Sequence, residues 1–331
     1  MIKNLRTLNT ILFLVLTLWT SHSHAADAPG ETRVAKWRDD KKAAFLLMFD
    51  DSMPSHVKNV VPELTKRGMV GTFYVNPGKG EWKAFRAAWE HDIAAAGMEY
   101  GNHTFTHQGI LSMENGEEEV GKANEAIAKV FPNRPNPRLI SFGIPGVAKG
   151  KWMITKEQLK ELLDKHHLVE RPNVGNRFAT ISLKTSADML KVVDAVIESG
   201  GLDCVAFHGV GGEWLSATVA TFTELLDGLA ARHEKLWITD HISAYKYETE
   251  RGTAEVKVLD ANAKQIRLTL SCKADPKLFD QPLTLITHVP AEWKKVRVVQ
   301  GKLQADLSAS DGSVRFDALP SDEPIVIGPV N

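Results

Sequence analysis

The sequence predicts an α/β barrel followed by a small antiparallel β-sandwich, and three observations predict it. From residue 42 to about 246, short apolar runs alternate with amphipathic helical stretches, which is typical of a parallel sheet covered by helices. Polar residues follow the carboxyl ends of several apolar runs, which favours a closed barrel over an open doubly wound sheet. Beyond residue 249 the helical stretches stop and a period of two begins, which is typical of antiparallel strands.

The length of 331 residues suits two domains. Because 43% of the residues are hydrophobic, the chain can bury a core and is not predominantly disordered. The 40 Lys and Arg residues nearly balance 41 Asp and Glu residues, which argues against a protein that binds nucleic acid through a broad basic surface. Two cysteines cannot form a disulfide scaffold. Cys204 and Cys272 could pair with each other in an oxidising compartment, but we expect two buried free thiols, because they lie in different predicted domains and Cys204 is inside an apolar run.

Residues 1–25 have the features of a signal peptide. Lys3 and Arg6 precede an apolar run of about ten residues, and residues 23–25 fit a cleavage site between small side chains. The run is shorter than the roughly 20 residues of a membrane-spanning helix, so we expect no membrane anchor after cleavage. The sequence thus predicts export, either to the periplasm or out of the cell, with residues 26–41 as an N-terminal linker.

The expected barrel domain covers residues 42–248. Residues 43–49 form a continuous apolar run, as expected of a strand buried on both faces. Apolar residues then recur at helical spacing from Val57 to Leu64, and Gly68 is expected to end that helix. The next predicted elements are a strand at 70–75, a helix at 81–96, a strand at 99–102, a helix at 117–131 and a strand at 139–142.

The second half of the barrel repeats the same pattern. Thr155 and Gln158 form a capping box for a helix that runs to Lys165. Further elements are a strand at 168–169, a helix at 187–199, a strand at 203–207, a helix at 218–232 and a strand at 236–238. Residues 249–331 carry few chemical groups, so we interpret this β-sandwich as a structural cap rather than as a carbohydrate-binding module.

Asp50 and Asp51 come at the end of the first buried strand. Two adjacent carboxylates at such a place repel each other unless a cation or a proton holds them. Helix capping is an equal alternative, since Asp51 or Ser52 could cap a helix that starts near Pro54.

Three histidines also follow predicted strands. His103 and His107 are four residues apart, a spacing that places both rings on one face of a helical turn, where they could bind one metal ion. With one carboxylate they would supply three ligands and leave room for water, as in catalytic metal sites. His208 follows the strand at 203–207 and is expected at the same end of the barrel.

Four motifs follow one another along the sequence: Phe49-Asp50-Asp51, His103-Thr104-x-x-His107, a strand end with proline, and Phe207-His208. In this order they resemble the motifs of the polysaccharide deacetylases. This family is also called the NodB-homology domain or carbohydrate esterase family 4, and the resemblance covers residues 42–246. It implies a distorted (β/α) barrel and metal-dependent removal of acetyl groups, most often N-acetyl groups, from a poly- or oligosaccharide. The alternatives are a pseudo-deacetylase that only binds carbohydrate and a hydrolase of another carbohydrate ester or amide, such as an O-acetylated glycan.

The resemblance also implies roles for individual residues. Asp51, His103 and His107 would bind a divalent metal ion, in this family usually Zn²⁺. Asp50 would be the general base and His208 the general acid. A binding protein needs neither a base nor an acid, so the presence of both favours catalysis.

The third motif departs from the family, in which an arginine, any residue, a proline and an aromatic residue follow one another. Here Gly143 stands in place of the arginine, Pro145 matches, and Gly146 stands in place of the aromatic residue, which predicts a wider cleft. Arg171 and Arg177 are candidates to replace the arginine from another strand end. The acidic and tryptophan partners of the acid histidine have no clear match, and no oligomeric state is indicated.

Substrate contacts are predicted near these glycines. Trp214 lies beside a glycine-rich loop and could stack on a sugar ring, with loop packing as an equal alternative. The candidate substrate-binding residues are therefore Pro145, Gly146, Arg171 and Trp214.

Overall fold

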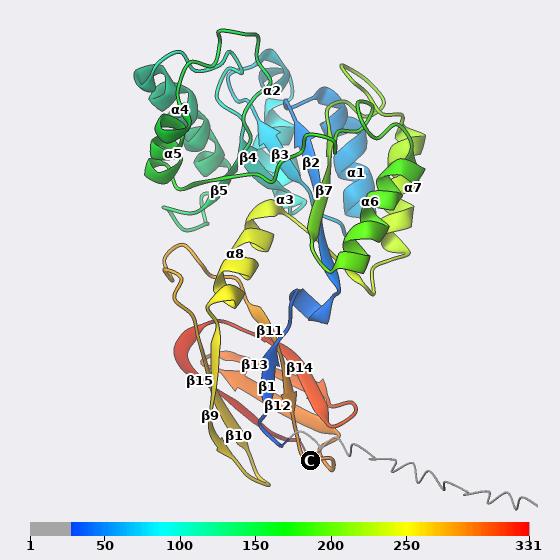
Figure 1. The fold of residues 1–331 in the computed structure, drawn as a ribbon, viewed down its shortest axis with the longest axis vertical. Coiled ribbons are helices and arrows are strands. Elements are labelled where there is room, and N and C mark those ends of the chain that lie inside the picture. Colours follow the sequence, from blue (N-terminus) through cyan, green and yellow to red (C-terminus); the bar gives the residue numbers. More distant parts are fainter. Residues whose placement is uncertain (1–27, 331) are drawn as a thin grey trace, which may run out of the picture.

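The computed structural model of the protein describes residues 28–330. Over this range the chain forms an α/β barrel and a smaller β domain, with helix α8 (His241–Gly252) between them (Figure 1). The predicted signal peptide, residues 1–25, lies outside the described residues. Within the described range, no helix has the length and apolar character needed to cross a bilayer.

A parallel sheet of seven strands forms the barrel and confirms the predicted fold class. The strand order is β6-β5-β4-β3-β2-β7, and β8 pairs with the amino-terminal half of β2. The strands are β2 (Ala43–Asp50), β3 (Thr72–Val75), β4 (Glu99–Asn102), β5 (Ile140–Phe142), β6 (Leu168–Glu170), β7 (Leu202–Phe207) and β8 (Leu236–Thr239).

Strand β2 pairs with three other strands of the sheet, β3, β7 and β8. All eight of its residues are buried, as the continuous apolar run predicts. The ring of Phe49 stacks on Phe73 of β3 at 4.7 Å and on Phe207 of β7 at 5.5 Å between ring centroids. These contacts fix the carboxyl ends of three neighbouring strands relative to one another.

The barrel is distorted between β6 and β7, where an irregular segment at residues 171–179 crosses the gap. The Ala206 amide donates to the Arg177 carbonyl at 3.0 Å, and the Ala179 amide donates to the Ala206 carbonyl at 2.9 Å. The segment therefore pairs with β7 without forming a regular strand, and Arg171 at its start lies at the carboxyl end of β6.

Helices surround the sheet (Figure 1). They are the π-helical turns η2 (His56–Val60) and η3 (Ala88–Asp92) and the helices α1 (Val61–Lys66), α2 (Gly80–Ala84), α3 (Ile93–Ala95), α4 (Met113–Val130), α5 (Lys156–Lys165), α6 (Ser186–Ser199) and α7 (Val219–Ala230). The predicted single helix at 81–96 is wrong, since α2, η3 and α3 share that range. The predicted helix at 117–131 begins earlier, because Ser112 caps it through the Asn115 amide.

Two antiparallel sheets form the β domain and confirm the predicted sandwich. Their strand orders are β1-β11-β14 and β13-β12-β15-β10-β9. The strands are β1 (Thr32–Val34), β9 (Glu255–Ala261), β10 (Ile266–Ser271), β11 (Leu283–His288), β12 (Lys295–Gln300), β13 (Leu303–Ser308), β14 (Ser313–Ala318) and β15 (Ser321–Pro329). Apolar residues of both sheets share one core.

The described part of residues 26–41 is not a linker, which corrects the sequence-based expectation. Thr32 pairs with Thr287 in antiparallel register, so β1 is the edge strand of the first sheet. Trp37 is buried, its ring lies 6.3 Å from the rings of Trp237 and Tyr247, and its indole N–H donates to the Gly200 carbonyl at 3.0 Å. The apolar surface of this segment is thus part of the β-domain core, and the barrel is inserted between β1 and β9.

The β domain packs against the amino ends of the barrel strands. Ala44, near the start of β2, shares an apolar cluster with Tyr247 of α8 and with the β-domain core. The Tyr247 hydroxyl donates to the Ala35 carbonyl at 3.0 Å. The carboxyl ends of the strands therefore open at the opposite end of the barrel, away from the β domain (Figure 1).

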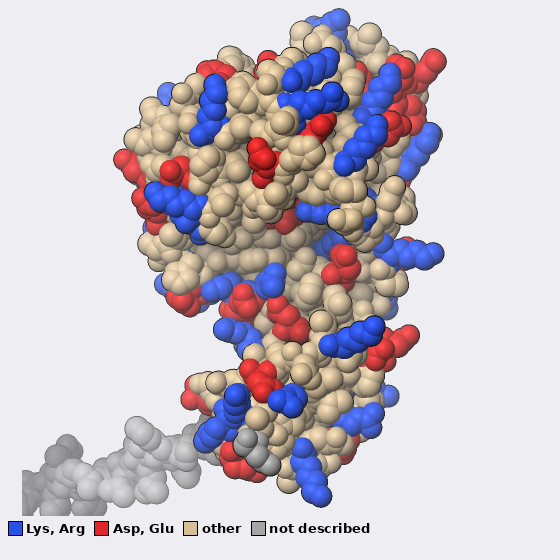
Figure 2. Space-filling model, turned by 180° about the vertical axis from the view of Figure 1, so that it is seen from behind, with Lys and Arg blue, Asp and Glu red and all other residues tan. Residues whose placement is uncertain are grey.

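The charged side chains on the surface are mixed in sign, as the balanced composition predicts. On the face shown in Figure 2, Lys and Arg side chains are interspersed with Asp and Glu side chains on both the barrel and the β domain. This face has no broad basic field of the kind that binds phosphate backbones.

Both cysteines are free, but Cys272 is only half-buried whereas Cys204 is buried.

Glu250 of α8 gives a testable pH effect at the junction of the two domains. Its side chain is buried, accepts a hydrogen bond from the Gln281 amide at 3.1 Å, and has a pKa that burial raises to about 7. In the unfolded chain a Glu has a pKa of about 4.3. Ionisation of Glu250 therefore increasingly disfavours the folded state as the pH rises from about 4 to 7.

We expect Glu250→Gln to raise the melting temperature at pH 8, with a gain that shrinks steadily towards pH 4. The glutamine keeps an oxygen that can accept the bond from Gln281 but cannot ionise. Thermal unfolding followed by circular dichroism at both pH values measures the difference. An equal gain at pH 4 and pH 8 would show that ionisation is not the cause.

Candidate metal and catalytic site

The predicted catalytic and metal-binding residues meet at the carboxyl ends of the barrel strands. Asp50 is the last residue of β2, and Asp51 follows it with a left-handed backbone (φ 77°). His103 directly follows β4, and His208 directly follows β7. Parallel strands bring their carboxyl ends to one edge, so these side chains share a single site.

Asp51, His103 and His107 form a group that could hold a metal ion, as the sequence predicts. One donor atom from each residue lies within 4.8 Å of the others. Nε2 of His107 is 3.0 Å and Nε2 of His103 is 3.7 Å from Oδ1 of Asp51. That oxygen is buried and has no hydrogen-bond partner of acceptable geometry among the described residues. Two imidazoles and one carboxylate around an unsatisfied oxygen fit a divalent cation.

Hydrogen bonding and charge prepare these residues for a cation. Nδ1 of His103 lies 2.7 Å from the Gly143 carbonyl oxygen, which can only accept, so the proton is on Nδ1 and the lone pair of Nε2 faces Asp51. Burial lowers the pKa of His103 to about 4, which keeps the ring neutral. Burial alone would raise the pKa of Asp51, but the imidazoles of His107 and His103 and the ammonium of Lys79 hold it well below its usual range.

The two histidines are not on a helical turn, which corrects the sequence-based interpretation of their spacing. Residues 103–109 form a loop, in which Thr104 and His107 have positive φ angles of 63° and 62°. The side-chain amide of Asn76 donates to the carbonyl oxygens of both His103 and Thr104. The loop geometry, rather than helical periodicity, brings the rings together.

Glu119 of α4 also fixes the loop at residues 103–109. Its carboxylate accepts hydrogen bonds from the Thr106 hydroxyl at 2.7 Å and the Thr106 amide at 2.8 Å. Sequence reasoning missed Glu119 and Asn76. The available signals were a glutamate that lies on the buried side of a predicted helix and a polar residue placed directly after a predicted strand.

Asp50 is paired with Arg171, so one of the two candidate arginines takes the place of the missing one. Nη1 and Nη2 of Arg171 donate to the two carboxylate oxygens at 2.5 and 2.9 Å, and both side chains are buried. Burial alone would raise the pKa of Asp50, but the guanidinium of Arg171 and the ring of His103 hold it below its usual range. Arg177 instead pairs with Asp203.

Gly143 explains how the guanidinium of Arg171 fits. A Cβ atom at position 143 would lie 3.1 Å from Cζ and Nε of Arg171 and 2.9 Å from the ring of Tyr74. The guanidinium also lies over the Tyr74 ring, 4.4 Å from its centroid. The arginine that the third motif lacks at position 143 and the use of Arg171 are therefore connected, since glycine at position 143 leaves the space that the Arg171 guanidinium occupies.

His208 is held by aromatic rings rather than by a carboxylate. Its ring stacks on Phe178 at 4.9 Å and meets Trp214 edge-on at 4.7 Å. Its Nδ1 atom is buried and has no hydrogen-bond partner among the described residues. Burial lowers the pKa of His208, and the negative charge of Asp50 opposes that effect only in part.

The candidate substrate residues lie around this site. Trp214 is 59% exposed beside His208, and Pro145 is buried on the loop that follows β5. Gly146 is exposed on the same loop, and a Cβ atom there would meet nothing within 4 Å. Position 146 therefore has open space for a side chain, whereas Arg171 is a hydrogen-bond partner of the proposed base, Asp50.

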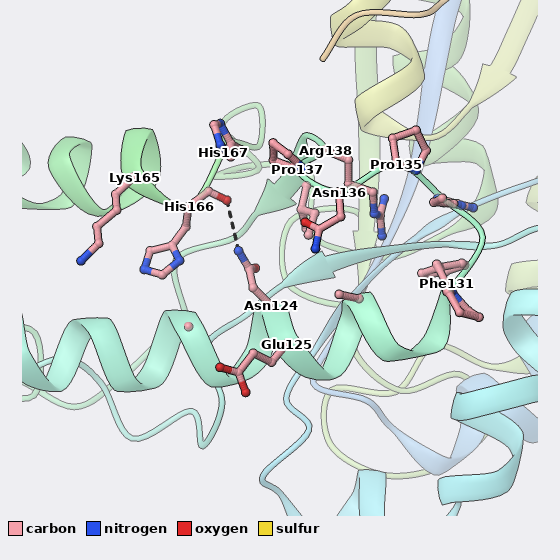
Figure 3. Close-up of a pocket in the computed structure, with 15 residues that line it drawn as sticks. Asn124, Glu125, Phe131, Pro135, Asn136, Pro137, Arg138, Lys165, His166 and His167 are labelled. Atoms are coloured by element: carbon pink, nitrogen blue, oxygen red, sulfur yellow. Dashed lines mark hydrogen bonds between the residues drawn. The ribbon is translucent and has the colours of Figure 1, made fainter. Parts of the chain in front are cut away.

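A cavity of about 380 Å³ lies elsewhere, between α4, the end of α5 and the loop before β5 (Figure 3). Asn124 there donates to the His166 carbonyl at 3.1 Å. Arg138, which also lines the cavity, is already paired with Glu99 at 2.9 Å. The cavity contains none of the predicted site residues and lies near the amino end of β5, so we do not assign it to the site.

The fold and this group of residues define an α/β-barrel protein with side chains at its strand ends that could hold a metal ion. Residues 38–160 match the family model described as polysaccharide deacetylase. This match agrees with the resemblance to the polysaccharide deacetylases that the strand-end motifs predict, and it covers residues 38–160 of the 331. The matched range includes Asp50, Asp51 and both loop histidines but ends before Arg171 and His208.

Individual proteins show more distant similarity. A gellan lyase from Bacillus sp. is 22% identical over an alignment of 317 positions, which covers 84% of this chain but only 12% of the lyase. A family 4 carbohydrate esterase from Streptomyces lividans in complex with acetate is 21% identical, with a TM-score of 0.44 over 60% of this chain and 92% of the esterase. A family 4 pseudoenzyme from Bacillus anthracis is 17% identical, with a TM-score of 0.42 over 60% of this chain and 64% of its own.

Proposed function

We propose that the protein is a metal-dependent hydrolase that removes acetyl groups from a poly- or oligosaccharide. One observation carries the proposal: the metal-binding group of Asp51, His103 and His107 lies beside a buried aspartate that is clamped by an arginine. Nε2 of His103 is 3.9 Å from Oδ2 of Asp50, so the proposed base faces the same small volume as the ligands. Two nitrogen ligands and one oxygen ligand suit Zn²⁺, which we propose as the ion.

A divalent ion bound there would supply Lewis-acid chemistry, lowering the pKa of water and polarising an acetyl carbonyl. Asp50 accepts the proton of the attacking water. Its lowered pKa keeps it ionised at neutral pH, and each carboxylate oxygen that receives a bond from Arg171 still has a second lone pair. Arg171 keeps both oxygens in one orientation, which is the positioning that proton transfer requires.

His208 protonates the leaving atom, either the nitrogen of an amino sugar or a sugar oxygen. Its ring is fixed between Phe178 and Trp214 and lies within the field of both Asp50 and Asp51. The exposed face of Trp214 stacks on the apolar face of a sugar ring next to the acid. N-acetyl groups are our preferred substrates, and O-acetyl groups are the alternative within the same chemistry.

A carbohydrate-binding protein without turnover is the second candidate function, because the third motif lacks its arginine and family 4 includes a pseudoenzyme. The buried pair of Arg171 with Asp50 favours catalysis, since it restores a guanidinium to the base. We also propose that the protein acts outside the cytoplasm, because residues 1–25 have the features of a signal peptide. The β domain, at the other end of the barrel, is then structural.

The decisive experiment measures acetate release by the zinc-loaded mature protein from N-acetylated and O-acetylated oligosaccharides. We expect release from one class, its loss after treatment with a chelator, and its return when zinc is added. His103→Ala should lose both the activity and the bound zinc, as elemental analysis would show, with an unchanged circular dichroism spectrum. A protein that binds zinc fully and releases no acetate from either class would favour the binding function instead.

A further inference from the structure

His56 is a completely buried histidine for which the proposed mechanism has no use. It begins the π-helical turn η2, six residues after Asp50, and its side chain has no solvent exposure. It is not in the metal-binding group. Burying an imidazole is costly unless its polar atoms are bonded, and Nδ1 of His56 has no hydrogen-bond partner among the described residues, so the bond at Nε2 is the informative contact. Single π-helical turns are also frequent at functional sites.

The ring of His56 holds the backbone of the proposed acid. Nε2 of His56 lies 2.7 Å from the carbonyl oxygen of His208. A carbonyl oxygen can only accept, so Nε2 carries the proton and donates it. Burial lowers the pKa of His56 to about 4, so the ring is neutral and has this one N–H to give.

Residues beside His56 hold the rest of the same loop. The Ser55 hydroxyl accepts a hydrogen bond from the Val210 amide at 3.1 Å, and the Asn59 side chain donates to the Val210 carbonyl at 2.6 Å. The Ser55 amide donates to the Glu213 carboxylate at 3.1 Å. Residues 55–59 thus fasten the loop after β7, and only His56 acts on residue 208 itself.

The ring of His56 cannot move freely, because three aromatic rings of the barrel core surround it. Its centroid lies 5.5 Å from that of Phe49, 5.6 Å from Phe73 and 6.3 Å from Trp89, all in edge-on contact. Phe49 directly precedes Asp50 on β2. The same rigid segment therefore carries the proposed base, one metal ligand and the donor that holds the backbone of the proposed acid.

We infer that His56 is a positioning residue that sets the distance between His208 and Asp50. The inference rests on the proposed function for the role of His208. The His208 side chain has stacking contacts but no hydrogen bond at Nδ1, so its place depends on the backbone that carries it. A donor buried in the core and bonded to that backbone limits its movement to the small range that proton transfer tolerates.

Two substitutions separate positioning from simple core packing. His56→Leu fills a similar volume without a donor, whereas His56→Gln keeps an N–H near the place of Nε2. We expect His56→Leu to lower kcat at least tenfold at unchanged KM and zinc content, and His56→Gln to recover most of the loss. Tyr100→Phe is the control, because it removes a buried hydrogen bond from the same aromatic cluster without touching His208. It should lower the melting temperature and leave kcat unchanged.

An NMR measurement makes the test independent of activity. The wild type should show a slowly exchanging Nε2 proton from His56, and the Cε1–H signal of His208 should shift in His56→Leu but return towards the wild-type position in His56→Gln. If the zinc-loaded wild type is inactive but these signals behave as stated, the proposed function fails and the positioning contact stands. The inference is overturned if His56→Leu leaves the His208 signal in place, or if it keeps the kcat of an active wild type.

Discussion

Asp50→Asn will reduce acetate release by about 10²–10⁴-fold, the usual contribution of a general base, while bound zinc remains unchanged. Asparagine has the shape of aspartate but cannot accept the proton of the attacking water. Its amide group would also turn a donor towards the guanidinium of Arg171, which now donates to both oxygens of Asp50. The proposed metal ligands are separate residues, so we expect the ion to be retained.

Asp51→Asn is the matched control, because it changes the neighbouring carboxylate in the same way. It removes the charge of the oxygen that lies near both histidines, so zinc should be lost along with activity. Rates from a coupled acetate assay and zinc content from elemental analysis separate the two variants. Loss of zinc in Asp50→Asn, or activity comparable with the wild type, would contradict the assignment of base and ligand.

Arg171→Ala will cost both activity and stability. It leaves the buried carboxylate of Asp50 without its partner, and breaking a buried ion pair typically costs about 3–5 kcal/mol. Without the guanidinium, burial will raise the pKa of Asp50. The base then ionises only at higher pH, so the acidic limb of the pH–rate profile should move upward. Urea unfolding and rates measured from pH 4 to 9 report the two effects.

Gly143→Arg tests whether the guanidinium that pairs with Asp50 can come from position 143 instead of position 171. Gly143→Arg alone should be harmful, because a Cβ atom there crowds the guanidinium of Arg171. In the Arg171→Ala background the same change should restore part of the rate, since the space is vacant and a guanidinium can again reach Asp50. A purely additive double-mutant cycle would refute this exchange.

The grouping of the candidate metal ligands could be predicted because short motifs contain all three residues. Asp51, His103 and His107 follow apolar runs that form strands, and parallel strands place their carboxyl ends together. The structure brings donor atoms of the three residues within 4.8 Å of one another, although by a loop and not by the helical turn that the i, i+4 spacing suggested. The local geometry depends on Asn76 and Glu119, whose bonds to the loop connect distant parts of the sequence.

The pairing of Asp50 with Arg171 could only be a guess from sequence. The two residues are 121 positions apart, and Arg171 and Arg177 both lie near the end of a short strand. Only the backbone path across the gap between β6 and β7 determines which one faces the site. In a similar way, the three residues of β1 are too few to show a period of two, so the sequence could not distinguish a strand from a linker.

The placement of β1 has a consequence for how the chain folds during synthesis. Thr32 and its partner Thr287 are 255 residues apart, so β1 leaves the ribosome long before β11 exists. Closing so long a loop is slow, and until then Val34 and Trp37 have no sheet to join. The barrel is therefore expected to fold first and to bring the two ends of the β domain together, so β1 is expected to pair late although it is synthesised before the barrel.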